Sequence, residues 1–184
     1  GLWERLLLRW LPLMRRTAPD VSVRAEIGFE TDLMQGLIEG RLDIGVMYTP
    51  QSRPGLTVEP LMEENLIMVS TRRTARAEPD ADYVYVDWGP EFYTKHNARF
   101  PDFVGAGITA NIGWLGLQHV LQFGGSGYFP IRLVQPYLQD GQLHRQHDAP
   151  AFPLPAYLVY SSDADQDLLA RALEGIRQVA AEAA

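Results

Sequence analysis

The pattern of apolar and polar residues is clearest near the N-terminus, where two alternating stretches enclose one helical stretch. Apolar residues alternate with polar ones from Val21 to Ile27, which predicts a strand with one buried face. Apolar residues at helical spacing follow between Thr31 and Gly40, and a second alternating stretch covers residues 42–48. The order strand, helix, strand predicts a parallel pair joined by a right-handed helical crossover.

This unit places the chain in the α/β class. Ligands of such sheets bind beyond the carboxyl ends of the strands. Those ends are predicted at residues 28–31 and 47–49, which are therefore the first candidate functional positions.

The remaining pattern predicts a mixed succession of helices and strands. An amphipathic helix covers residues 2–16, and Pro12 predicts a bend near Leu8. Glu63 and Glu64 are predicted to lie in a hairpin between two strands, where both are solvated. Strands are predicted over 56–62, 65–71, 83–86, 105–110 and 156–160, and the last of these is expected to pair with 66–69. Helices are predicted from Pro90 onward, over 114–123, over 131–138 and after a cap at Ser161 or Ser162.

Composition limits the possible functions. The 184 residues, 46% of them hydrophobic and 21% charged, predict an ordinary soluble globular protein of one domain or two small lobes. With 16 Lys and Arg against 23 Asp and Glu, the net charge is −7, so this part of the protein is not expected to bind DNA by itself. The absence of cysteine excludes disulfides and thiolate metal sites, and it fits the reducing cytoplasm. No apolar run has membrane-spanning length.

Two short motifs resemble a known family. Pro19-Asp20-Val21 precedes the first strand, and residues 37–45 read Leu-x-x-Gly-x-Leu-Asp-x-Gly. Together with the preceding helix, this order is similar to the effector-binding domain of LysR-type transcriptional regulators. A glycine-rich turn and a proline over residues 124–130 are also similar to that family, and the resemblance covers essentially the whole chain.

The resemblance implies a fold like that of the type II periplasmic binding proteins. Two Rossmann-like lobes are joined by two crossing strands, with lobe I over 1–72 and 161–184 and lobe II over 73–160. A small effector is bound in the cleft between the lobes. A separate winged helix-turn-helix domain, expected upstream, binds DNA. Family members also have a strand before the first helix, and since nothing precedes Gly1, that strand is expected to be missing here.

The predicted effector site combines strand ends of both lobes. Backbone N–H groups there can hold an anion, and Thr31 and Asn111 can add polar contacts. The aromatic residues favour a flat or apolar ligand, such as an aromatic or amphipathic acid, whereas Glu30 and Asp87 would repel a highly charged anion or meet a ligand amine. Packing between the lobes is an equally good explanation for some of these aromatic residues. The predicted site residues are Phe29, Glu30, Thr31, Tyr48, Thr49, Asp87, Trp88, Asn111, Ile112, Ser126 and Tyr128.

The resemblance also implies a homo-oligomer, a dimer or tetramer in which two effector domains pack antiparallel. Residues 2–16 and 21–27 of one copy would lie against 105–110 and 114–123 or 131–138 of the other. The first helix carries more apolar residues than one core face requires, which leaves a strip for a partner. This strip is expected to contain Trp3, Leu7, Leu8 and Met14.

Other chemistry is not predicted. The glycine run lacks the lysine of a phosphate-binding loop, and Ser126 lacks the spacing of a nucleophile elbow. His144 and His147 would point to opposite faces of a strand, so no metal site is expected, and no cofactor is expected either. His96 is interpreted as a partly buried histidine bonded to the backbone rather than an effector ligand.

Two alternatives remain open at the level of the sequence. A solute-binding protein of a transporter has the same two-lobed fold, and a small hydrolase or transferase is the weaker possibility. The segment upstream separates the first two classes, because a secretion signal indicates a transporter component and a winged helix-turn-helix indicates a regulator.

Overall fold

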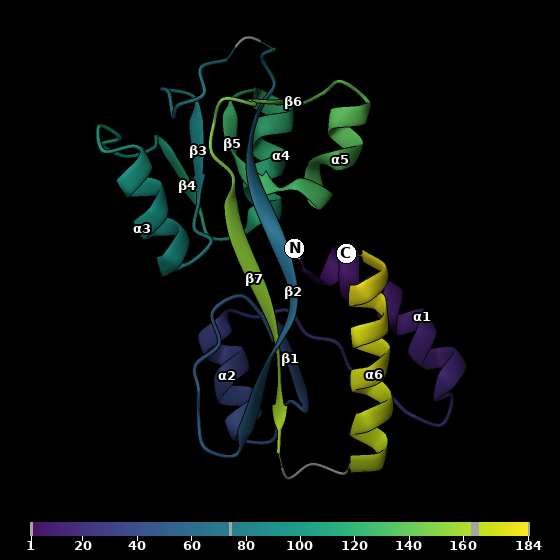
Figure 1. Ribbon diagram of the computed structural model, residues 1–184. Helices are drawn as coiled ribbons and strands as arrows, with labels where there is room; N and C mark the ends of the chain where they lie inside the picture. The colour runs from purple at the N-terminus through teal and green to yellow at the C-terminus, as the bar shows by residue number, and fades with distance from the viewer. Residues whose placement is uncertain (1, 74, 163–165, 184) are drawn as a thin grey trace. The chain divides into compact units, whose positions relative to one another are not determined.

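The chain forms two compact units. The computed structural model describes residues 2–73, 75–162 and 166–183 (Figure 1). Unit 1 comprises Glu64–Leu154, and unit 2 comprises Leu2–Glu63 together with Pro155–Ala184. The boundaries fall inside two long strands, β2 (Leu56–Ser70) and β7 (Phe152–Ser161), whereas the lobe boundaries predicted from the sequence are 72/73 and 160/161. Each strand therefore contributes residues to both units.

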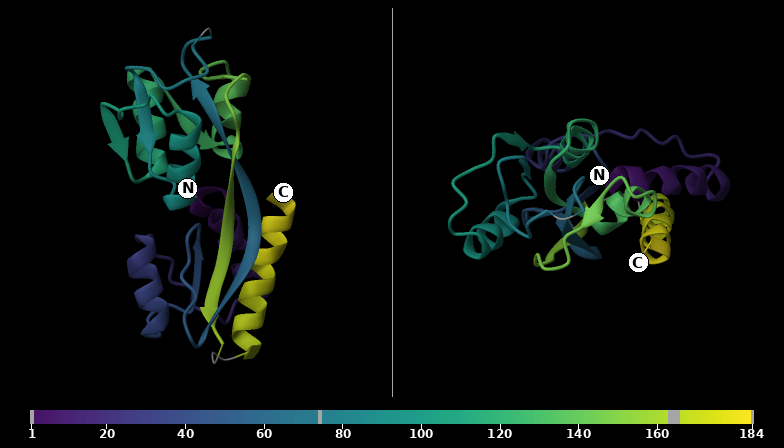
Figure 2. Two further views of the ribbon diagram at one scale, coloured as in Figure 1. Left: turned by 60° about the vertical axis from the view of Figure 1, so that its left-hand side comes forward. Right: turned by 90° about the horizontal axis from the view of Figure 1, so that it is seen from above.

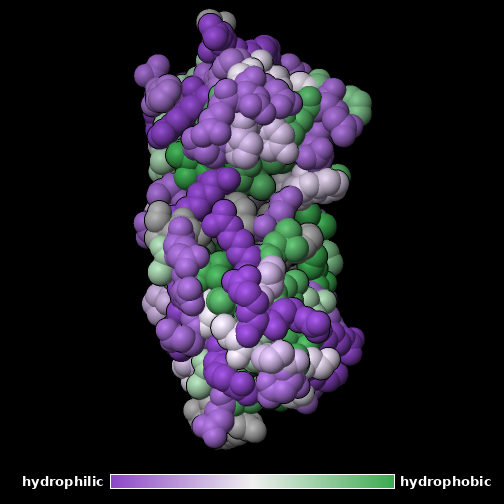
Figure 3. Space-filling view, turned by 90° about the vertical axis from the view of Figure 1, so that its right-hand side faces the viewer, coloured by the Kyte–Doolittle hydropathy of each residue, from purple (hydrophilic) through white to green (hydrophobic). Residues whose placement is uncertain are grey.

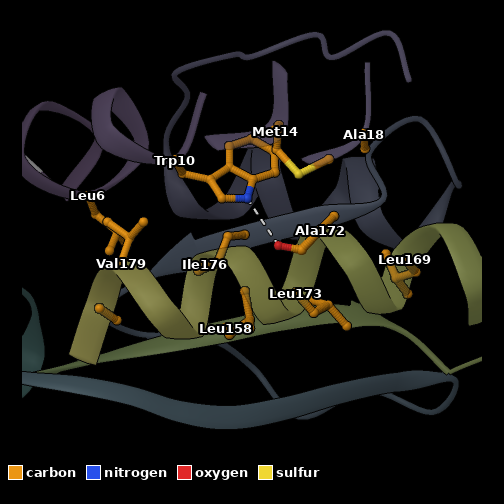
Figure 4. Packing of buried hydrophobic residues seen from close by; sticks show 11 residues of the cluster. Leu6, Trp10, Met14, Ala18, Leu158, Leu169, Ala172, Leu173, Ile176 and Val179 are labelled. Carbon is orange, nitrogen blue, oxygen red and sulfur yellow. Dashed lines mark hydrogen bonds between the residues drawn. The ribbon is translucent and has the colours of Figure 1, made fainter. Parts of the chain in front are cut away.

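Unit 2 has a core of helices packed on one another. A short π-helix, η1 (Trp3–Leu7), leads into α1 (Leu8–Thr17), and α6 (Gln166–Ala183) lies alongside them (Figures 1 and 2). Apolar residues of α1 and α6 interlock, with Trp10 at the centre (Figure 4). The Trp10 indole N–H donates to the Ala172 carbonyl over 3.0 Å, so the polar atom of this buried ring is satisfied. Unit 2 corresponds to the predicted lobe I, and the last helix packs on it as predicted.

The first helix changes its hydrogen bonding at Leu8. The π-helical turn ends at Leu7 and the α-helix begins at the next residue. Pro12 has no N–H to donate to the carbonyl four residues earlier, which is that of Leu8. The irregularity lies where the sequence predicts a bend. The residues just before α6, 163–165, lie outside the described part of the chain, so its predicted serine cap stays a prediction.

A small sheet and one helix complete unit 2. Strand β1 (Ile44–Met47) pairs antiparallel with β7, and β7 lies beside β2. Helix α2 (Glu30–Ile38) packs on this sheet through Met34 and Leu37, which contact Met47 and Val159. The predicted helix and second strand of the N-terminal pattern are confirmed.

The predicted strand over residues 21–27 is wrong. This segment has no strand partner among the described residues, and β1 lies at an edge of the sheet with β7 as its neighbour. Val21 and Val23 pack against the helical core, whereas Ile27 is exposed. Alternation of side chains describes which face is apolar, but a strand forms only where a neighbour accepts its backbone hydrogen bonds.

Unit 1 is a mixed sheet with helices on both faces. The strand order is β2-β5-β3-β4, with β6 (His144–Arg145) also on β2. Strands β3 (Tyr83–Val86), β4 (Ile108–Ala110) and β5 (Ser126–Pro130) are parallel, and β2 runs antiparallel to β5. The helices are α3 (Pro90–Arg99), α4 (Gly113–Phe123) and α5 (Ile131–Gln139).

Successive side chains of β3 point to opposite faces of the sheet in unit 1. Tyr83 and Tyr85 contact aromatic residues of α3, whereas Val84 and Val86 lie beneath Gly116 of α4. This period of two is the one expected for a strand buried on both faces. The sheet thus fixes α3 and α4 on opposite sides, and both helices begin at the carboxyl ends of parallel strands.

Three details of the predicted strands need correction. Residues 56–70 form one strand, so there is no hairpin at Glu63 and Glu64; Glu63 is exposed and Glu64 is buried, as alternation along a continuous strand requires. Strand β4 is shorter than predicted. Strand β7 begins at Phe152, earlier than the predicted start at residue 156, and it includes Pro153 and Pro155.

The surface is predominantly polar on the face shown in Figure 3, with smaller apolar areas between the polar side chains. Among the described residues, no helix combines the length and apolar character needed to cross a membrane.

The helical core of unit 2 predicts the effect of truncating Trp10. The change Trp10→Ala removes a buried ring and its hydrogen bond, so we expect the free energy of unfolding to fall by about 3–5 kcal/mol. Urea denaturation followed by circular dichroism measures the change. Leu8→Ala on the same helix is the control, since Leu8 is about half exposed. Equal losses in the two variants would contradict this account of the core.

Candidate functional site

The carboxyl ends of β3 and β4 bring four of the predicted site residues together. The two strands are paired in parallel, and the Asp87 N–H donates to the Ala110 carbonyl over 2.8 Å. Residues 87 and 88 therefore lie next to residues 111 and 112. Helices α3 and α4 begin immediately afterwards, so this edge of unit 1 has the strand ends and helix N-termini that α/β proteins use for ligands.

Trp88 supports this edge rather than presenting its ring to solvent. Its side chain is 7% exposed, and the indole N–H donates to the Tyr128 carbonyl over 2.9 Å. The ring packs directly on Gly113, where an added Cβ would collide with it. Glycine at the start of α4 is thus required by the close approach of the tryptophan.

Three neighbouring side chains are exposed at the same edge. Asp87 accepts a hydrogen bond from the Gly89 N–H over 3.0 Å, a turn that Gly89 permits with its φ of 101°. Asn111 and Ile112 are exposed on the connection into α4. An amide, a carboxylate and an apolar side chain are therefore available to a ligand here.

Ser126 lies at the opposite end of the parallel strands. It pairs with Tyr83, the first residue of β3, and is 1% exposed. Gly125, with a φ of 121°, lies so close to the Asp82 carbonyl that a side chain would collide with it. The glycine run therefore lets β5 start beside β3, and the structure does not bring Ser126 together with residues 87, 88, 111 and 112.

A cavity of about 390 Å³ lies at this amino-terminal end. Arg72 lines this cavity, and its guanidinium group donates hydrogen bonds to the carboxylates of Asp80 and Asp82, each over 3.0 Å. His119 and Phe123 form part of the aromatic wall. The cavity is separate from the predicted site.

Tyr128 lies inside an aromatic cluster between the sheet and α3. Its side chain is 1% exposed, and burial raises the pKa of its hydroxyl far above the ordinary value. The cluster is formed by residues of β3, α3, β5, β7 and the loop after α3, which are Tyr83, Tyr85, Phe92, His96, Phe100, Phe103, Tyr128 and Phe152. The Tyr128 side chain therefore belongs to the core of unit 1 and not to its surface.

His96 is at the centre of this cluster and corrects the prediction made for it. The imidazole is 0% exposed, and its Nε2 shares a hydrogen bond with the Tyr83 hydroxyl over 3.0 Å instead of bonding to the backbone. Burial lowers its pKa, and a smaller contribution from Asn97 opposes this. A neutral imidazole is thus the stable form within the aromatic surroundings.

The strand end of unit 2 is organised by Glu30. Its Oε1 accepts hydrogen bonds from the backbone N–H groups of Tyr48 and Thr49, over 2.9 and 3.1 Å. Glu30 is the first residue of α2, so one carboxylate connects the start of the helix to the end of β1. Phe29, which precedes it, is 57% exposed, and Thr31 is exposed as well.

The predicted residues thus form two groups, one in each unit. Residues 29–31, 48 and 49 are together in unit 2, and residues 87, 88, 111 and 112 are together in unit 1. Ser126 and the side chain of Tyr128 are elsewhere in unit 1. The cleft expected between the lobes stays a prediction.

One candidate residue was not identified from the sequence. Arg132 is the second residue of α5, which begins directly after β5 and hence at the same edge as Asp87. Its Nη1 is buried without a hydrogen-bond partner among the described residues. A buried, unpaired guanidinium nitrogen is unusual and suits an anion. The available signal was an arginine in the first turn of a helix that follows a strand.

Metal binding finds no support in the described part of the chain, where no three His, Cys, Asp or Glu side chains are grouped as metal ligands. His144 is in β6 and His147 is in the turn that follows.

The fold and sequence are similar to those of known regulators. A family model described as the LysR substrate binding domain matches residues 2–180. The HTH-type transcriptional regulator HdfR of Escherichia coli (strain S88) is 23% identical over 180 residues. That alignment covers 94% of this chain and 62% of HdfR, so the chain spans less than two thirds of that relative.

Solved structures show the same fold. The bromide ion-bound regulatory domain of HypT from Salmonella typhimurium matches with a TM-score of 0.76 and 17% identity, over 95% of this chain and 90% of that one. Full-length LysG from Corynebacterium glutamicum with bound effector Arg matches with a TM-score of 0.72 and 17% identity, over 96% and 64% of the two chains.

The buried imidazole of His96 predicts a pH-dependent stability. Its pKa in the folded chain lies below the unfolded value of 6.5, so the folded state binds fewer protons. This destabilisation is absent well above pH 6.5, grows as the pH falls below 6.5, and reaches its full size below the folded pKa. We expect the free energy of unfolding to fall as the pH is lowered from about 6.5 to about 5.5, and His96→Phe to remove part of that slope. Urea titrations at each pH measure the slope.

The control is His147→Gln, since His147 is exposed. An unchanged slope in His96→Phe, or an equal change in both variants, would show that His96 does not cause the pH dependence.

Proposed function

Because the chain belongs to the LysR substrate binding domain family, we propose that it is the ligand-sensing part of a cytoplasmic transcriptional regulator. The match over residues 2–180 is the observation that carries this proposal. According to this proposal, the chain catalyses no reaction, and DNA is contacted by a separate helix-turn-helix domain. The net charge of −7 supports this division, because DNA repels an acidic surface.

A small organic effector would bind at the strand ends. In unit 1 the available side chains are Asp87, Asn111 and Ile112, with Arg132 placed at the same edge. In unit 2 they are Phe29, Glu30 and Thr31. Most of these side chains are exposed beside helix N-termini, which supports the assignment. Ser126 and the Tyr128 side chain are left out of the proposed site because both are buried.

The alternative of a transporter solute-binding protein has less support. It shares the fold, but the curated relative is an HTH-type transcriptional regulator.

We expect the effector domains to associate through α4. This helix exposes Trp114, Leu115 and Phe123, the last to 75%, although they are large and apolar. On α1, Leu8 is also exposed, which is consistent with the predicted strip. Met14 is not part of that strip, because it is buried in the core of unit 2, and Leu7 packs partly against the same core. The Trp3 side chain lies outside the described part of the structure.

The exposed apolar side chains of α4 predict how association can be disrupted. The change Leu115→Glu places a charge on this face, so we expect the association constant to fall about tenfold or more with an unchanged thermal midpoint. Sedimentation equilibrium of the chain measures it, with Gln122→Glu as the control of equal charge. A monomeric wild-type chain at high concentration would contradict the dimer.

Asn111 tests the effector site. A library of small organic amines and acids is first screened by thermal shift with the wild-type chain. For compounds that raise the midpoint, Asn111→Leu should lower the affinity about tenfold by removing one polar contact, and Thr31→Leu should do the same. Isothermal titration calorimetry measures both, and Asn65→Leu, at an exposed position of β2, is the control. Unchanged affinity in folded Asn111→Leu and Thr31→Leu variants would remove these residues from the site.

A further inference from the structure

The backbone donors at the end of β1 are already occupied. The N–H groups of Tyr48 and Thr49 follow the last residue of the strand, and both donate to Oε1 of Glu30. Two adjacent N–H groups are the arrangement that binds a carboxylate or another oxyanion. The protein therefore supplies its own carboxylate at the position where an anionic ligand would bind.

Glu30 still has accepting capacity. A carboxylate has about four lone-pair positions, and the described hydrogen bonds of Glu30 use only Oε1. The residue is partly exposed, so Oε2 can accept a hydrogen bond from a ligand. Asp32, in the same first turn of α2, adds a second negative charge.

We propose that Glu30 determines the specificity of this strand end, which takes a cationic amine or guanidinium group of the effector and excludes a carboxylate. The inference rests on the proposed effector-binding function. A ligand ammonium would donate to Oε2 in a charge-assisted hydrogen bond. A ligand carboxylate could not bind the N–H groups of Tyr48 and Thr49, because Glu30 already accepts their hydrogen bonds, and the negative charge of Glu30 would repel it. This narrows the earlier expectation of an acid, whose anionic group would have to bind elsewhere.

The first test follows the two N–H groups directly. Sodium acetate is titrated into the ¹⁵N-labelled chain, and the amide signals of Tyr48 and Thr49 are recorded by NMR. In the wild type we expect no saturable shift. Glu30→Ala frees the donors, so both signals should shift and saturate at millimolar acetate. Asp32→Ala, with the same change in charge in the same turn, should behave like the wild type.

The second test compares two probes with similar aromatic bodies and opposite charges, 2-phenylethylamine and 3-phenylpropanoate. Ligand-observed NMR should show tighter binding of the amine to the wild-type chain. Glu30→Gln keeps an oxygen that can accept the two N–H bonds but removes the charge, so the amine affinity should fall about tenfold or more, with little change for the acid.

The outcomes separate this inference from the proposed function. A saturable acetate response of Tyr48 and Thr49 in the wild type, or none in Glu30→Ala, overturns the role of Glu30. Equal or tighter binding of the acid, or binding of neither probe at millimolar concentration, overturns the cation preference. If the acetate test succeeds but no compound of the screened library binds, the proposed effector function fails while the exclusion of anions by Glu30 stands.

Discussion

The need to satisfy backbone hydrogen-bonding groups at strand edges and strand ends shapes both units. At the end of β1, the N–H groups of Tyr48 and Thr49 follow the last residue of the strand, and Glu30 accepts both. At the end of β3, the Asp87 N–H continues the ladder to Ala110, and the Asp87 carboxylate then accepts the Gly89 N–H. Each strand end is therefore fixed before any ligand arrives. Pre-organised positions of this kind reduce the ordering cost of binding.

Local patterns predicted most of the elements because each pattern depends on neighbours in the sequence. The helices that begin at Pro90 and Ile131 and the strand 83–86 were found from periodicity and from the conformational preferences of proline and glycine. Residues 21–27 and the supposed hairpin at Glu63 were not predicted correctly. In both cases the outcome depends on hydrogen bonds with segments far away in the chain, which periodicity does not report.

The candidate site shows the same limit at the level of single residues. Placement at a strand end was correct for Asp87 and Asn111, because parallel strands end at a common edge. Ser126 was assigned to the wrong end of its strand, since only the pairing of β5 with β3 shows that it lies beside Tyr83. Tyr128 was assigned to a surface because its aromatic ring suits ligands and cores equally well, and only burial distinguishes the two.

The order of the units along the chain has a consequence for synthesis on the ribosome. Unit 1 is one continuous segment, 64–154, so all its strands and helices are available as soon as that segment has emerged. Unit 2 is discontinuous, and Trp10 and Met14 of α1 must wait until α6 has been made before their apolar surfaces are covered. During that interval the first helix is an exposed amphipathic segment that chaperones can bind. Vectorial synthesis therefore allows unit 1 to fold before α6 emerges and unit 2 can be completed.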